Sequence, residues 1–143
     1  MKTLVKFLKA LYLSCMIGLL AISVYGQTDS SVLEKLKKTW EMQGMTDKTA
    51  DDKYVNDKII HHLNGQHFAN EEYYLSDSIV TAFDPNKVGK IFNGRYIVSR
   101  VLPGKKNTNP VPVNVLEIIE LDNDKLILKN IKRPHILLEY KAK

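Results

Sequence analysis

Hydrophobic and polar residues alternate between Val113 and Tyr140, the most regular stretch of the chain. Within it, the polar run Asp122–Lys125 has the composition of a tight turn, because Asn and Asp tolerate left-handed backbone angles and hydrogen-bond their own backbone. The pattern predicts two strands joined at Asn123–Asp124. Side chains alternate between the faces of a strand, so this register puts four apolar residues on one face. They are Leu121 opposite Leu126 and Ile119 opposite Leu128.

A third strand is predicted after the break at Arg133–Pro134, where apolar residues again recur at every second position. One face would hold Ile136, Leu138 and Tyr140, and the other His135, Leu137 and Glu139. The alternation slips once, near Ile118–Ile119, which indicates either a β-bulge there or a strand covered on both faces. This slip decides whether Glu117 points into the fold or out of it.

The chain before this region is also mostly strand-like. Ser30 or Ser31 can cap a short helix, and Trp40–Met45 alternates as a first strand would. Residues 51–63 fit two predictions, a helix with apolar residues at helical spacing or strands that turn at Asn64–Gly65, and the helix is slightly favoured. Further strands are expected at residues 73–75, 78–83 and 90–102, followed by an exposed loop at 103–110.

Several short strands with at most two helices near the start predict a mainly β protein, either a sandwich or a small antiparallel barrel. The barrel is favoured because hairpins follow one another to the end of the chain. We predict a signal peptide at residues 1–26 and one barrel domain at residues 27–143.

The signal peptide is predicted from a basic start followed by an apolar run, Ala10–Ala21, and by a small residue at Gly26. An uncleaved membrane anchor is disfavoured because the run is short for a span of roughly 20 residues. Lipoprotein anchoring through Cys15, the single cysteine, is also disfavoured, because the apolar run continues beyond it. The expected mature chain is therefore exported to the periplasm or the exterior, with no membrane span and no cysteine.

Charge gives little indication of a partner once the leader is removed. The chain has 21 basic and 16 acidic residues, and residues 1–26 contain three Lys and no acid, which leaves 18 against 16. No basic stripe with interleaved aromatic residues accompanies this small excess, so no nucleic-acid partner is expected.

Three segments resemble the lipocalin-like domains of small secreted bacterial proteins, of the kind common among Bacteroidetes. Leu36–Trp40 is similar to the opening L-x-G-x-W motif, although Lys38 replaces its glycine. Gly94–Val98 is similar to a later G-x-Y-x-I/V strand, and Ile119–Lys129 is similar to a hairpin of the form L-turn-D-K-L-x-L-K. The segment Thr46–Phe68 has no counterpart in that pattern.

This resemblance implies an up-and-down barrel whose interior holds a small hydrophobic or amphipathic ligand. A barrel of eight strands is just wide enough to be filled by its own side chains or to hold one small molecule. An ordinary packed core is the equally weighted alternative. The candidate interior residues, with Arg100 and Glu117 as polar members, are Trp40, Tyr96, Val98, Arg100, Glu117, Ile119, Leu121, Leu126, Leu128, Ile136 and Leu138. A cation–π contact of Trp40 with Arg100 or Arg133 is also considered.

Catalytic and metal-binding patterns are weak. His61, His62 and His67 lie near Glu71 and Glu72, but adjacent histidines point apart on a helix or a strand, and no H-x-x-x-H spacing occurs. No G-x-S-x-G elbow and no glycine-rich phosphate loop is present. We therefore expect a protein that is not an enzyme and uses no cofactor.

Two functional hypotheses follow. The leading one is an exported binding protein for a small apolar or amphipathic ligand. The alternative is a non-enzymatic cell-envelope interaction module with a filled barrel, which would bind a protein partner through residues 103–112 or 46–68.

Overall fold

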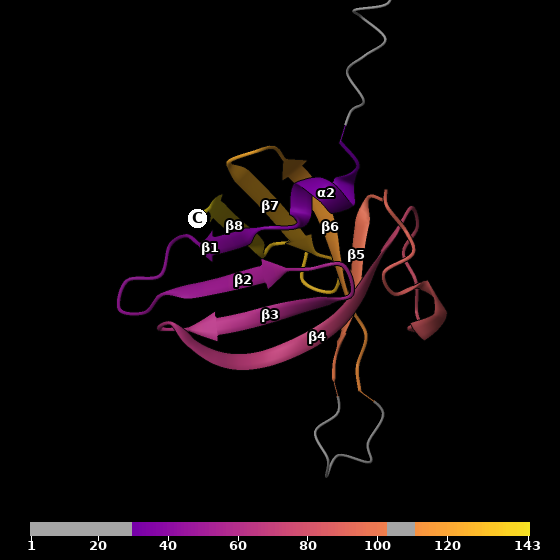
Figure 1. Cartoon of the computed structure of the whole chain (residues 1–143), viewed down its shortest axis with the longest axis horizontal. Helices are drawn as coiled ribbons and strands as arrows, with labels where there is room; N and C mark the ends of the chain where they lie inside the picture. The colour runs from indigo at the N-terminus through magenta and orange to yellow at the C-terminus, as the bar shows by residue number, and fades with distance from the viewer. Residues whose placement is uncertain (1–29, 103–110) are drawn as a thin grey trace, which may run out of the picture. The chain divides into compact units, whose positions relative to one another are not determined.

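Eight antiparallel strands close into an up-and-down barrel in the computed structural model, which describes residues 30–102 and 111–143 (Figure 1). The strands follow the sequence order, and the last pairs with the first. The elements are α2 (Val32–Leu36), β1 (Thr39–Met42), β2 (Ala50–Tyr54), β3 (Lys58–Leu63), β4 (Gln66–Ser76), the 3₁₀ helix η1 (Pro85–Lys87), β5 (Tyr96–Val101), β6 (Asn114–Leu121), β7 (Lys125–Asn130) and β8 (Leu137–Ala142). The predicted mainly β barrel with a short N-terminal helix is confirmed.

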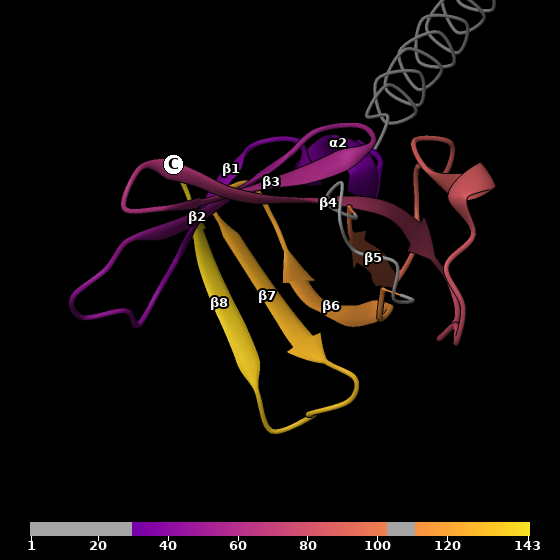
Figure 2. The same ribbon diagram turned by 90° about the horizontal axis from the view of Figure 1, so that it is seen from below.

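The barrel closes where β1 lies against β8, with Trp40 opposite Ala142 and Met42 opposite Tyr140. Closure leaves no free edge, because each strand is hydrogen-bonded on both sides. Figure 2 shows β6, β7 and β8 leaving the β1–β4 half of the sheet at a steep angle, as the curvature of a small barrel requires.

Residues 51–63 form most of β2, a turn at residues 55–57 and β3, so the favoured helix there is wrong and the hairpin alternative is correct. β3 turns into β4 through Asn64 and Gly65, which both have positive φ, of 51° and 76°. Asn and Gly accept this backbone conformation at low cost, and the resulting turn twists in the same sense as the strands. Local helical spacing of apolar residues was outweighed by the turn and by strand pairing on both sides.

The predicted strand at residues 78–83 is also wrong. The chain between β4 and β5 instead folds over the outside of the sheet, where Val80, Phe83 and Ile91 pack on Tyr74, Val98 and Val115. Strands β4 to β6 are therefore covered on their outer face as well as on their inner face. This second layer explains why neighbouring residues, which point to opposite faces of a strand, are all apolar at 73–75 and 97–98.

The β6–β7 hairpin contains the turn predicted at Asn123–Asp124, with Leu121 opposite Leu126. The register shifts between Ile118 and Glu120, so that Ile118 rather than Ile119 lies opposite Leu128. The bulge alternative is thus confirmed, and Ile119 is left 48% exposed.

One end of the barrel is closed by α2 and Trp40. Ser31 caps this helix by accepting a hydrogen bond from the Glu34 amide, and Leu33 and Leu36 are buried against the barrel core. The indole Nε1 of Trp40 donates to the Leu36 carbonyl at 3.0 Å, and the ammonium of Lys38 lies 5.2 Å from the ring centroid. The expected contact of Trp40 with Arg100 or Arg133 is therefore replaced by one with Lys38.

Several predictions lie outside the described residues: the signal peptide at 1–26, the lipidation alternative at Cys15 and the loop at 103–110. In the described part of the chain, no helix has the length and apolar character needed to cross a membrane.

Candidate functional site

A cavity of about 430 Å³ occupies the half of the barrel opposite α2 and opens at that end. It is bounded by the end of β1, the start of β2, the end of β3, the start of β4, the end of β5, the start of β6 and the first half of β8. Most of its wall is apolar. Its volume falls in the range of small-molecule sites, roughly 300–1,000 Å³.

Four polar side chains of the cavity form one layer, and Asn114, opposite Ser99 on β6, also lines the cavity. Asp52, His61, Glu71 and Ser99 each lie two residues deeper along their strand than an apolar residue nearer the mouth. Those outer residues are Ala50, Leu63, Ala69 and Val101. Alternation fixes this arrangement, since inward positions on one strand are two residues apart. A molecule entering the mouth therefore meets apolar wall first and polar groups below it.

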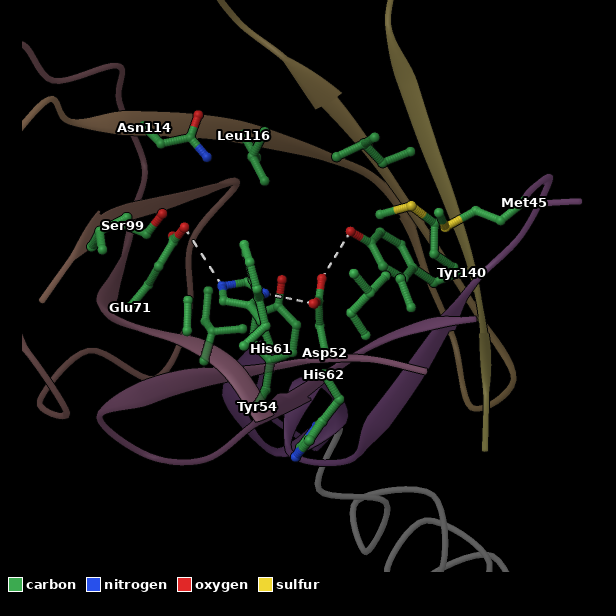
Figure 3. Close-up of a pocket in the computed structure, with 18 residues that line it drawn as sticks. Met45, Asp52, Tyr54, His61, His62, Glu71, Ser99, Asn114, Leu116 and Tyr140 are labelled. Carbon is green, nitrogen blue, oxygen red and sulfur yellow. Dashed lines mark hydrogen bonds and ion pairs between the residues drawn. The ribbon is translucent and has the colours of Figure 1, made fainter. Parts of the chain in front are cut away.

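His61 stands at the centre of this polar layer (Figure 3). Its Nδ1 lies 2.6 Å from Oδ1 of Asp52, and its Nε2 lies 3.5 Å from Oε1 of Glu71. The hydroxyl of Tyr140 donates to the second oxygen of Asp52 at 2.9 Å. Burial disfavours the charged imidazolium, but the hydrogen bonds to Asp52 and Glu71 outweigh it and raise the pKa of His61 to about 9.

Glu71 and Ser99 keep unused hydrogen-bonding capacity. Burial disfavours the Glu71 carboxylate, but contacts with His61 and Ser99 outweigh this and lower the pKa of Glu71. The Ser99 side chain is 1% exposed, and its hydroxyl makes no hydrogen bond of good geometry. Nε2 of His61 is also buried, and its one partner is the long 3.5 Å contact with Glu71. Buried polar atoms in native proteins are usually paired. The Ser99 hydroxyl and Nε2 of His61 border the cavity, where a ligand would complete their hydrogen bonds.

The predicted interior residues divide into three groups. Leu138 lines the cavity, whereas Trp40, Leu121, Leu126 and Leu128 pack in the core cluster without lining the cavity. Tyr96, Val98, Arg100 and Glu117 lie on the outer face, in the opposite phase to Ile97 and Ser99, and so do not belong to the interior. Ile119 is exposed at the bulge, and Ile136 precedes β8 without lining the cavity.

The two polar candidates form ion pairs outside the barrel. Arg100 pairs with Glu72, and its guanidinium lies 4.4 Å from the Phe83 ring centroid. Glu117 pairs with Lys129 and Arg95, which lower the pKa of its carboxyl. Both pairs contribute to the outer surface of the sheet, and neither can orient a ligand in the lumen.

His61 and His62 point to opposite faces of β3, as expected for neighbouring strand residues. Nδ1 of His62 lies 3.0 Å from Asp51, whose other oxygen accepts from Lys143. No group of three or more His, Cys, Asp or Glu side chains in residues 30–102 and 111–143 is arranged to hold a metal ion.

Asp52 and His61 are absent from the predicted interior residues, because the helix favoured for residues 51–63 gives them no common inward face. If residues 58–63 form a strand, His61 shares a face with the apolar residues Ile59 and Leu63. In the same way, the carboxylate of Asp52 shares a face with Ala50 and Tyr54. Charged residues at inward positions are uncommon unless they are paired, so this pattern was the available signal.

Comparison with known proteins gives no match: no family model, curated protein or solved structure is similar to this chain. The resemblance to lipocalin-like domains therefore stays a prediction, and the function has to be argued from the cavity.

Proposed function

We propose that this protein binds a small amphipathic ligand inside the barrel. The observation that carries the proposal is the open cavity of about 430 Å³ with an apolar wall and a polar layer beneath it. Such a combination of apolar wall and few convergent polar groups is typical of small-molecule sites. The alternative hypothesis of an interaction module required a filled barrel, so the cavity weighs against it.

A binding role is preferred to a catalytic one because the cavity lacks an assembled nucleophile and base. Nε2 of His61, the nitrogen that would act as the base, faces Glu71 at 3.5 Å, and the Ser99 hydroxyl is not hydrogen-bonded to the imidazole. Nucleophilic catalysis by serine needs such a hydrogen bond to activate the hydroxyl.

Titration with the neutral fluorescent dye N-phenyl-1-naphthylamine tests the proposal. We expect saturable binding at a single site, since the dye is apolar and of suitable size. Leu138→Trp should abolish it by placing an indole in the cavity. Glu139→Trp is the matched control, because Glu139 is the next residue on β8 and its side chain is exposed. Equal binding by the two folded variants would place the dye elsewhere, and no binding by the wild type would refute the proposal.

Export is the second part of the proposal and is supported by the sequence of residues 1–26 alone. Expression of the full chain in a bacterium with two membranes, followed by fractionation and N-terminal sequencing, tests it. The expected result is a periplasmic or extracellular protein that begins at Gln27. An uncleaved chain or a lipid-modified Cys15 would contradict it.

A further inference from the structure

The side chains that line the cavity carry more acidic than basic groups. Asp52 and Glu71 supply two carboxylates, and no Lys or Arg belongs to the lining of the described cavity. His61 is the cation of the polar layer, whereas the ring of His62 pairs with Asp51 on the outer face. With His61 charged, the layer retains one excess negative charge.

The two carboxylates differ in how far they are already satisfied. Asp52 is held by His61 at 2.6 Å through one oxygen and by Tyr140 at 2.9 Å through the other. Glu71 has only the 3.5 Å contact with His61, which is long for a hydrogen bond, together with the neighbouring Ser99 hydroxyl. Asp52 therefore serves to hold the imidazole in place, and Glu71 is the carboxylate left to meet a ligand.

Ser99 provides an independent indication that a polar group enters here. Its side chain is almost completely buried and lines the cavity, and its hydroxyl lies beside Glu71 without making a hydrogen bond of good geometry. A buried hydroxyl without a full hydrogen bond destabilises the folded protein, and a ligand donor or acceptor would remove this penalty. Beside an unsaturated carboxylate, the complementary group is one with several N–H donors and a positive charge.

We infer that the ligand is an amphipathic primary amine, whose ammonium group binds Glu71 and Ser99 while its apolar body lies against the outer wall of the cavity. This inference rests on the proposed function and specifies its ligand class. An ammonium has three donors and no acceptor, which suits a carboxylate and a hydroxyl oxygen. A carboxylate head group, as in a fatty acid, would instead add a third negative charge close to Asp52 and Glu71.

Three ligands with the same chain and different head groups provide the test: decylamine, decanol and decanoate. Each is titrated against the protein loaded with N-phenyl-1-naphthylamine at about pH 7, where Glu71 is ionised. We expect the amine to displace the dye at a concentration about tenfold or more below that of the alcohol, since tenfold corresponds to about 1.4 kcal/mol. Decanoate should be the weakest. Binding of decanoate at least as tight as that of the amine would overturn the inference while leaving the proposed function intact.

Removal of the Glu71 charge identifies the residue responsible. Glu71→Gln should bring decylamine to about the affinity of decanol, with dye and decanol binding unchanged. Glu72→Gln is the matched control, since Glu72 is adjacent on β4 but pairs with Arg100 on the outer face. A preference for the amine that survives Glu71→Gln would contradict the assignment.

Ser99→Ala provides a second variant with a smaller change in structure, so the test does not depend on the folding of Glu71→Gln. It should weaken decylamine about three- to tenfold and leave decanol within about twofold, as expected for one charge-assisted hydrogen bond. Equal loss for both ligands would indicate a general effect on the cavity and would refute a contact of Ser99 with the ammonium. If the dye and all three ligands fail to bind to the wild type, the proposed function itself is wrong.

Discussion

Asp52 and His61 lie directly opposite each other on β2 and β3, and their side chains form a 2.6 Å contact inside the barrel. The contact joins neighbouring strands at the level where the filled half of the barrel gives way to the cavity. It also orients the imidazole so that Nε2 points toward Glu71 (Figure 3). The pair is thus part of both the fold and the polar layer of the site.

Stability should fall between about pH 6.5 and pH 9. The pKa of His61 is raised from 6.5 to about 9 by Asp52 and Glu71 against the effect of burial, so the folded state binds the proton more tightly than the unfolded state. The stabilisation is complete below the unfolded pKa and is lost as the pH rises through the folded one. We expect a loss of about 2 kcal/mol, since solvent at the open mouth screens part of the interaction.

Urea unfolding at about pH 6 and about pH 9.5 measures this loss. The groups that face the imidazole are Asp52, Glu71, Tyr54 and Tyr140, and the tyrosine hydroxyls do not ionise in this range because burial raises their pKa. His61→Gln should be less stable at the lower pH and should show a much smaller change between the two. An unchanged pH dependence in this variant would assign the effect to another group.

Asp52→Ala should destabilise the fold by about 2–3 kcal/mol, because it removes the charged hydrogen-bond partner that keeps the proton on the His61 imidazole. The Tyr140 hydroxyl loses its acceptor at the same time. Glu120→Ala is the control, since its ion pair with Lys125 is open to solvent, with the two side chains 43% and 48% exposed. Its cost should stay near or below about 1 kcal/mol, as is usual for pairs open to solvent. Chemical denaturation of both variants checks the difference, and similar losses would be inconsistent with the inward position of Asp52.

Leu128→Ala should cost about 2–5 kcal/mol, since the side chain is fully buried in the barrel core. Ile119→Ala should change the free energy of unfolding by less than about 0.5 kcal/mol, because the bulge leaves Ile119 on the surface. A regular hairpin would pair these two residues and make both substitutions costly. The ratio of the two effects, measured by thermal or urea unfolding, therefore tests the bulge.

Gly94→Ala should destabilise the protein by about 1–3 kcal/mol through overpacking. A Cβ at this position would lie 2.7 Å from the Ser76 amide nitrogen, and backbone cannot move aside as a flexible side chain can. Gly44→Asn is the control, because nothing lies within 4 Å of a Cβ there and Asn tolerates its φ of +83°. The melting temperatures of the two variants should differ clearly. Equal values would mean that β4 and the Gly94 segment can separate without cost.

The sequence by itself determined the parts of the fold that depend on local chemistry. The turn at Asn123–Asp124, the Ser31-capped helix and the alternation through Leu138 and Tyr140 were all predicted, because turn residues, caps and strand periodicity are set by neighbours in the chain. The barrel followed from the number and spacing of such strands.

Only the tertiary structure decided which face of each strand points inward. Val98 and Ile97 are equally apolar, and only the folding of segment 77–95 back over the outer face of β4, β5 and β6 covers Val98 on that side. The bulge at Ile118–Glu120 reversed the phase of β6, so Glu117 points out. The cavity likewise depends on Asp52, His61, Glu71 and Ser99 converging from four strands. The local sequence pattern shows that alternate residues share a face of the strand. It does not show which of the two faces points into the barrel, because that depends on the segments that cover each face.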